Sequence, residues 1–85
     1  MEIRWNLEKD AKLKAERGIS FDDILKGNII GSFYHHVRKD QRILLIEFQN
    51  YIWVVPYVLD KGYMFLKTLY PSRKYTKEYK NDRQI

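Results

Sequence analysis

Five cations near the C-terminal end of the chain form the clearest group of side chains that could do chemistry. They are Lys67, Arg73, Lys74, Lys77 and Lys80. The residues around them predict a helix over 73–80 that Ser72 caps after Pro71. Its first turn then holds two cations, where the helix dipole disfavours positive charge and free backbone N–H groups attract anions. We therefore expect Arg73 to bind a phosphate, and the other helix lysines to form a basic stripe beside the sheet.

The net charge of the chain is +5, and its distribution supports this expectation. Residues 61–85 hold seven basic and two acidic side chains, so the whole excess lies in the last strand, the closing helix and the tail. Such asymmetry is typical of proteins that bind a polyanion, nucleic acid above all. A solvated charged helix, with Arg73 and Lys74 as an ordinary surface pair, remains the alternative on charge alone.

His35 and His36 invite a metal site, which the sequence argues against. Neighbouring residues of a strand point to opposite faces, so the two imidazoles cannot chelate one ion together. The chain has no cysteine, and no paired carboxylates complete a ligand set. One of the two histidines remains a candidate acid or base, because histidine titrates near neutral pH.

The elements that must position these groups are strands predicted at residues 43–48, 51–58 and 63–70. Their β-branched and aromatic residues, and the turn residues between them, predict an antiparallel meander. A two-residue loop at Gln49 and Asn50 pairs Ile46 with Trp53, and a four-residue loop at the second turn pairs Val55 with Leu66. These four side chains then share one buried face, and Trp53→Ala should be severely destabilising. Pro56, unusual in a central strand, is interpreted as a bulge.

The opposite face of this sheet is the expected working side. In the predicted register Glu47 and Lys67 lie near each other across the middle strand, and a slip of one residue would exchange the two faces.

The N-terminal third supplies the cover for the core face. Asn6 should cap a first helix that ends at Gly18, and Ser20 with Asp23 should cap a second that Gly27 closes. Residues 29–36 form a plausible first strand, and Ile3 and Trp5 could form a short leading one. The predicted fold is therefore α+β: two N-terminal helices packed on an antiparallel sheet of about four strands, with a closing C-terminal helix.

Eighty-five residues make one small domain, spanning 1–85. The absence of cysteine fits a reducing cytoplasm. Apolar runs are of strand length and the N-terminus does not read as a signal peptide, so we expect neither secretion nor a membrane partner.

Four stretches of this sequence together resemble a known family. They are WN-xx-K near the start, RGISFDD after the first helix, RILLIEF with YIWVVPYV in the hairpin, and FLKTLYPSRKYTKEY at the end. In this order they are similar to BrnT-like toxins, which belong to the RelE/ParE superfamily of bacterial type II toxin–antitoxin modules. RGISFDD and LYPSRKYTKEY are the most specific pieces.

The resemblance implies a ribonuclease and a tightly bound antitoxin, usually a ribbon-helix-helix DNA-binding protein. It matches Arg73, Lys74 and Lys67 to the basic end of the family's motif. His36 resembles a histidine that precedes the hairpin in similar sequences, although HHVRKDQR here replaces a loop that more usually contains proline.

Cleavage of RNA by its own 2′-hydroxyl needs a base, positive charge for the phosphate and an acid for the leaving oxygen, with no cofactor. The candidate bases are Glu47, Lys67 and His36. The candidates for binding the phosphate are Arg73 and Arg42, and the candidates for the acid are Tyr79 and Lys74. The residues expected to bind RNA are Lys74, Lys77 and Lys80. The alternative is a module of the same fold that binds nucleic acid or protein without cutting.

Overall fold

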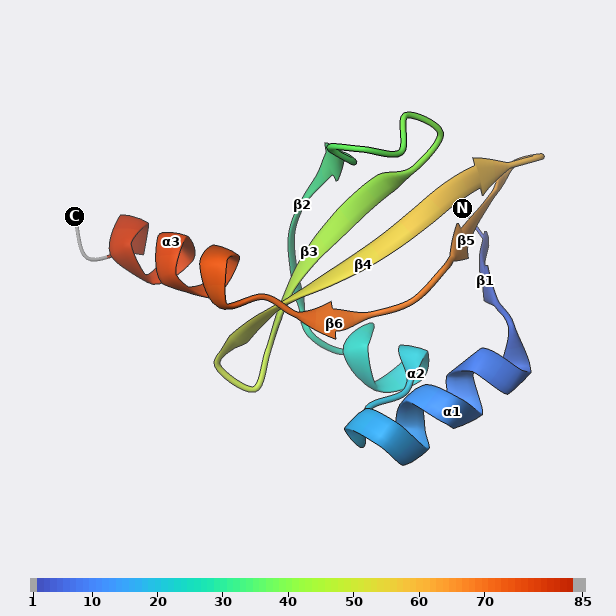
Figure 1. Ribbon diagram of the computed structural model, residues 1–85, viewed down its shortest axis with the longest axis horizontal. Coiled ribbons are helices and arrows are strands. Elements are labelled where there is room, and N and C mark those ends of the chain that lie inside the picture. The colour runs from blue at the N-terminus through green and yellow to red at the C-terminus, as the bar shows by residue number, and fades with distance from the viewer. Residues whose placement is uncertain (1, 84–85) are drawn as a thin grey trace.

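A computed structural model of the chain describes residues 2–83, with Asp82 and Arg83 described by their backbone alone. The described residues form three helices and six strands in an α+β arrangement (Figure 1). In chain order they are β1 (Glu2–Trp5), α1 (Leu7–Arg17), α2 (Phe21–Ile24), β2 (Asn28–Tyr34), β3 (Arg42–Phe48), β4 (Tyr51–Asp60), β5 (Tyr63–Leu66), β6 (Tyr70–Pro71) and α3 (Arg73–Arg83). None of the helices in this described part is long and apolar enough to cross a membrane.

The sheet corrects the predicted fold, which was wrong in strand number and direction. Six strands form it in the order β1-β5-β4-β3-β2, with β6 beside β4. The short leading strand expected at Ile3 and Trp5 is β1, which the predicted fold of two N-terminal helices on an antiparallel sheet did not include. It runs parallel to β5, so the sheet is mixed. The single strand predicted over residues 63–70 is two strands, β5 and β6, separated by residues 67–69.

The β3–β4 hairpin has the predicted register. Ile46 pairs with Trp53 and Leu44 with Val55, and the turn residues Gln49 and Asn50 have φ angles of 54° and 63°. Left-handed angles at both positions are what a two-residue turn of the twist-matching type requires. The predicted register of this hairpin is therefore confirmed.

The β4–β5 hairpin differs from its prediction by two residues. Tyr57, rather than Val55, pairs with Leu66. Lys61 and Gly62 form a two-residue turn with φ angles of 43° and 87°, so the predicted four-residue loop was wrong. A shift of two residues keeps every side chain on its predicted face, because strand side chains alternate with a period of two.

Pro56 lies in β4 without a bulge, since its pairing with Ile43 continues the β3–β4 register unbroken. The Pro56 carbonyl accepts a hydrogen bond from the Lys67 N–H at 2.8 Å, so this residue turns its backbone polar side away from β3. The backbone nitrogen of Pro56, which carries no hydrogen, therefore faces residues 67–69, between the end of β5 and the start of β6. Proline is tolerated there because no strand hydrogen bond is lost.

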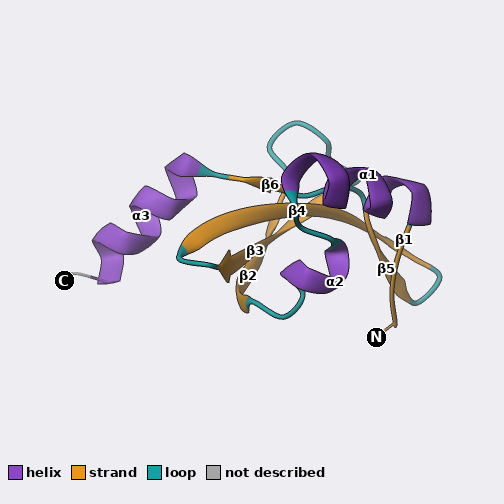
Figure 2. Ribbon diagram, turned by 90° about the horizontal axis from the view of Figure 1, so that it is seen from below, coloured by secondary structure: helices purple, strands orange, loops and turns teal. Residues whose placement is uncertain are grey.

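The first face of the sheet carries the main core. Leu13 of α1 and Phe21 and Ile24 of α2 pack there against β3, β4 and β5. The predicted burial of Ile46, Val55 and Leu66 is confirmed. Trp53 is only half-buried at the margin of this core, so the prediction of its full burial was wrong. Figure 2 shows α1 and α2 close together against the sheet, with α3 standing at the opposite end.

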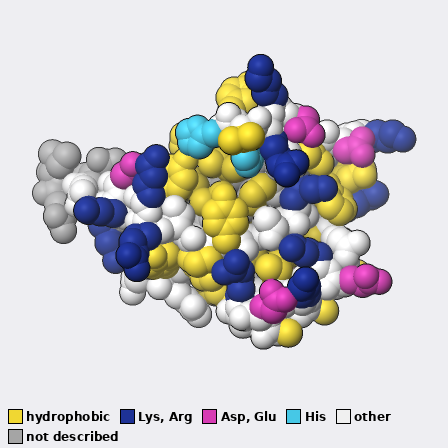
Figure 3. All heavy atoms as spheres, viewed as in Figure 1, with side chains coloured by type: hydrophobic (Ala, Val, Ile, Leu, Met, Phe, Trp, Pro, Cys, Tyr) yellow, Lys and Arg dark blue, Asp and Glu magenta, His cyan; other side chains and the backbone are white. Residues whose placement is uncertain are grey.

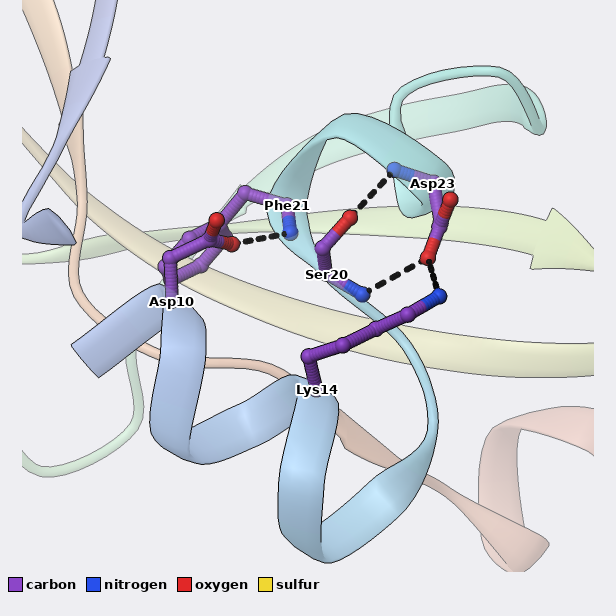
Figure 4. Close-up of polar contacts among 5 residues, drawn as sticks. All are labelled: Asp10, Lys14, Ser20, Phe21 and Asp23. Atoms are coloured by element: carbon purple, nitrogen blue, oxygen red, sulfur yellow. Dashed lines mark hydrogen bonds and ion pairs between the residues drawn. The ribbon is translucent and has the colours of Figure 1, made fainter. Parts of the chain in front are cut away.

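Polar contacts join the two N-terminal helices (Figure 4). Asn6 caps α1, and Ser20 and Asp23 form the expected capping box of α2. Asp10 accepts a hydrogen bond from the Phe21 N–H at 2.7 Å, and the Lys14 ammonium lies 2.8 Å from the Asp23 carboxylate. The Lys14 contact, together with the Ser20 backbone and hydroxyl, lowers the pKa of Asp23 to about 2.

Gly27 allows the end of the helical segment to approach β3 closely. A Cβ atom at this position would lie 2.6 Å from the Glu47 carbonyl oxygen and 2.7 Å from a methyl group of Ile46. Any side chain larger than hydrogen would therefore push this segment off the sheet.

Candidate functional site

The start of α3 is attached to the second face of the sheet, the face predicted to be the working side. Ser72 caps α3 by accepting from the Tyr75 N–H at 3.1 Å, and its own N–H donates to the Ile52 carbonyl at 2.8 Å. Tyr75 and Tyr79 then pack against a second core cluster on this face. The C-terminal helix thus contributes aromatic rings to the working side as well as cations.

Three hollows are connected along this face through shared residues. The first, which we call the basic cleft, has a volume of about 440 Å³ and is lined by Lys9, His35, Arg38, Gln41, Pro56, Lys67, Thr68 and Tyr70. The aromatic pocket, of about 80 Å³, is lined by His35, His36, Ile43, Val54, Tyr70 and Tyr75. The helix groove, of about 260 Å³, is lined by Ile30, Phe33, Leu45, Ile52, Tyr75, Glu78 and Tyr79.

The basic cleft lies beside the interval in the sheet next to Pro56. Residues 67–69 leave the sheet there, and the first turn of α1 and the β2–β3 loop supply the other walls. His35 shapes that loop, because its Nδ1 accepts hydrogen bonds from the N–H groups of Val37 (3.1 Å) and Arg38 (3.0 Å). This arrangement leaves Nε2 of His35 to carry the ring proton.

The electrostatics of the basic cleft favour an anion. Lys9, Arg38 and Lys67 line it, and no carboxylate of the described residues does. Among the described residues, none of these three cations forms a salt bridge. Figure 3 shows histidine side chains beside a hydrophobic patch in the middle of the molecule, with Lys and Arg side chains around it. A phosphate group is a suitable ligand for such a cleft.

Two of the predicted site residues come together here. Lys67 lines the basic cleft and His36 the aromatic pocket, and the two hollows share His35 and Tyr70. Within the described residues, no three His, Cys, Asp or Glu side chains gather as a metal-binding group.

Glu47 and Tyr79 form a second pair at the other end of the face. The Tyr79 hydroxyl donates to Glu47 Oε1 at 3.5 Å, a long contact, and the Tyr79 ring borders the helix groove. The predicted proximity of Glu47 and Lys67 is wrong, because it depended on the shifted register. Glu47 pairs with Ile52, whereas the Lys67 N–H donates to the Pro56 carbonyl. Ile52 and Pro56 are four residues apart along β4, which is about 13 Å.

Arg42 lies on the face opposite the three hollows, since it alternates with Ile43 along β3. Its guanidinium carbon is 5.1 Å from the ring centroid of Tyr34. Stacking on Tyr34 accounts for the position of this arginine, and its place on the opposite face separates it from the basic cleft.

The helix cations are all exposed on α3, and none of them lines the three hollows. The residues concerned are Arg73, Lys74, Lys77 and Lys80. Within the described part of the chain none of them forms a salt bridge. Arg73 follows Tyr70 by three residues, so it is the helix cation nearest in sequence to the cleft.

Sequence reasoning missed Lys9, Arg38 and the part of His35 in shaping the loop. Lys9 carried a usable signal, because it is a cation in the first turn of α1, the same unfavourable position that drew attention to Arg73. Arg38 carried none, since a charged residue in a polar loop is ordinary.

The fold resembles that of a solved toxin. The 1.1 Å crystal structure of the Brucella abortus ribonuclease toxin BrnT matches with a TM-score of 0.56 and 16% sequence identity, over 85% of this chain and 96% of that one. A scan against protein-family models and a search of curated proteins returned no match. At this identity the likeness establishes a shared fold.

Proposed function

We propose that this chain is the toxin of a type II toxin–antitoxin module and cleaves RNA as a metal-independent endonuclease. One observation carries the proposal. A fold shared with a ribonuclease toxin presents a cleft on one sheet face, and the described residues that line it include three cations and no carboxylate. The cleft adjoins a pocket with histidine and tyrosine. Membership of the BrnT group and of the RelE/ParE superfamily belongs to the same proposal, together with action in the cytoplasm, where RNA is found.

The basic cleft holds the scissile phosphate in this proposal. Lys9, Arg38 and Lys67 come from three separate parts of the chain, so folding brings together positive charge that the sequence disperses. Preorganised positive charge around the phosphate stabilises the transition state, in which the negative charge on the phosphate oxygens increases. Arg73, just beyond Tyr70, supplies a further phosphate contact through its planar guanidinium.

His36 is the proposed base. It removes the proton of the 2′-hydroxyl, whose oxygen attacks the adjacent phosphorus while the bond to the 5′-oxygen breaks. The ammonium of Lys67 gives its proton to that leaving oxygen. The products are a 2′,3′-cyclic phosphate and a 5′-hydroxyl, which conserves atoms and needs no further reactant. Glu47 and Tyr79 bind the RNA strand at the end of the sheet face that lies away from the basic cleft.

A cognate antitoxin, a small DNA-binding protein of the ribbon-helix-helix type, is the partner this proposal requires. Its acidic or mixed segments would complement the chain's net charge of +5 and speed association at low salt.

The proposal is tested by expressing the chain alone from an inducible promoter and following growth and RNA integrity. Purified chain made by cell-free synthesis is then incubated with RNA in EDTA, and the product ends are identified. We expect growth arrest, and fragments ending in cyclic phosphate that disappear with the His36→Ala/Lys67→Ala double variant. RNA that is bound but stays intact would instead establish the non-cutting module of the same fold.

A further inference from the structure

The aromatic pocket beside the basic cleft has the features of a site for a flat ring. Ile43 and Val54 form its floor and are 6% and 2% exposed, so the floor is apolar and formed by the rigid sheet. Tyr70 and Tyr75 contribute rings, and the exposed residue His36 contributes an imidazole. A ligand with apolar faces and a polar edge satisfies all three kinds of contact.

The position of the pocket identifies which flat ring it takes. His35 and Tyr70 line both the aromatic pocket and the basic cleft, so the two hollows are contiguous. In a nucleotide the base and the phosphate are likewise neighbours, joined by one sugar. The cleft suits the phosphate, and tyrosine rings are the usual stacking surface for unpaired bases in single strands.

We propose that the aromatic pocket binds one unpaired nucleobase of a single-stranded RNA and that Tyr70 is the ring on which it stacks. The inference rests on the proposed function, because it takes the occupant of the basic cleft to be an RNA phosphate. Its consequence is specificity: a base held in the pocket determines which phosphate of the strand lies in the cleft. Double-stranded RNA, whose bases remain stacked on each other, is excluded.

Tyr70 is suited to a substitution test. It is 38% exposed, and it lies in the short strand β6, where its backbone pairs with Val54 of β4. Its ring can therefore be changed with little effect on the core. Tyr34 provides a matched control, because it is a 75% exposed tyrosine on the opposite face of the sheet.

The experiment measures binding of short single-stranded 2′-O-methyl oligonucleotides, which cannot be cleaved through a 2′-hydroxyl. Fluorescence anisotropy compares each intact oligonucleotide with versions in which one position is abasic but keeps its phosphate. We expect one abasic position to weaken binding about 5- to 150-fold, the range for losing a base–aromatic stack. Tyr70→Leu should remove this difference, whereas Tyr70→Phe and Tyr34→Leu should retain it.

Equal binding of intact and abasic oligonucleotides would overturn the inference, even if the chain cleaves RNA as proposed. Equal binding by the wild type and Tyr70→Leu would do the same and would assign the pocket to another occupant, such as an apolar side chain of a protein. An abasic effect in a chain that never cleaves RNA would uphold the pocket and refute the ribonuclease. Folding of each variant is checked by urea unfolding.

Discussion

The hydroxyl of Thr76 accepts a hydrogen bond from the backbone N–H of Ile52 at 2.8 Å. The same hydroxyl donates to the Ser72 carbonyl at 2.6 Å, so it bridges the first turns of α3 and strand β4. Thr76 is 6% exposed, and water is largely excluded from this bridge. The contact holds Tyr75, one residue earlier, between the aromatic pocket and the helix groove.

Thr76→Val should destabilise the chain, because valine keeps the shape of threonine but leaves the Ile52 N–H without a partner. A buried donor left unpaired costs about 1–3 kcal/mol. Urea unfolding followed by circular dichroism measures the loss, and Thr76→Ser, which restores the hydroxyl, should recover part of it. Equal midpoints for Thr76→Val and the wild type would mean that the bridge does not hold α3.

The parts of the fold that the sequence predicted are those that depend on neighbouring residues. Asn6, Ser20 and Ser72 cap their helices as expected, and Gln49 with Asn50 makes the predicted hairpin turn. Each of these features is decided within a few residues, so the local pattern suffices. The parallel pairing of β1 with β5 joins Glu2 to Tyr63, and no local pattern encodes a contact of that range.

The candidate site was predicted less completely than the fold for the same reason. His36 and Lys67 were named as candidates from residue type, predicted register and family resemblance, but whether they lie near each other depends on where β5 ends. The length of the second hairpin turn decides where β5 ends. The predicted turn was two residues too long, and this error misplaced Lys67 beside Glu47. Lys9 joins the cleft from a helix that sequence reasoning assigned to structure alone.

Lys67→Ala should weaken RNA binding and lower its dependence on salt. A cation that contacts one phosphate releases about one counterion, so the slope of log K against log salt should fall by roughly one. Affinities measured for a non-cleavable oligonucleotide over a series of salt concentrations provide the slope. Lys26→Ala, which removes an exposed lysine outside the three hollows, is the matched control and should leave the slope unchanged. The same slope for both variants would place the phosphate outside the basic cleft.

His36→Ala and His35→Ala should reduce activity in different ways. As the proposed base, His36 should affect the chemical step, and its loss should slow single-turnover cleavage about 10²- to 10⁴-fold with RNA affinity changed far less. His35 holds the loop through the Val37 and Arg38 N–H groups, so its loss should mainly weaken RNA binding. Single-turnover rates over a range of enzyme concentrations separate the two effects. Identical profiles for the two variants would contradict these separate roles.

The stability of the helix pair should depend on acid through Asp23. Its folded-state pKa of about 2 is below the ordinary value of 3.8, owing first to Lys14 and then to Ser20. A lowered pKa means that the contact stabilises the fold above pH 3.8 and loses this effect as pH falls toward 2. Asp23→Asn should therefore be less stable than the wild type at neutral pH, with the difference shrinking over that interval. Asp22→Asn, the exposed neighbour in the same helical turn, should show no such convergence when thermal melts are compared across pH.

Arg73→Ala should impair RNA cleavage and toxicity strongly while leaving folding nearly unchanged. Arg73 is exposed at the start of α3 and forms no salt bridge within the described residues, so its loss should alter the free energy of unfolding by at most about 0.5 kcal/mol. Its guanidinium can bind two phosphate oxygens at once, and that contact strengthens as charge develops in the transition state. Arg73→Lys keeps the charge without the planar fork and should restore part of the rate. Lys80→Ala, two turns further along the helix, should weaken binding only slightly. A wild-type cleavage rate for Arg73→Ala would exclude the N-terminus of α3 from the active site and leave the chemistry to the basic cleft and His36.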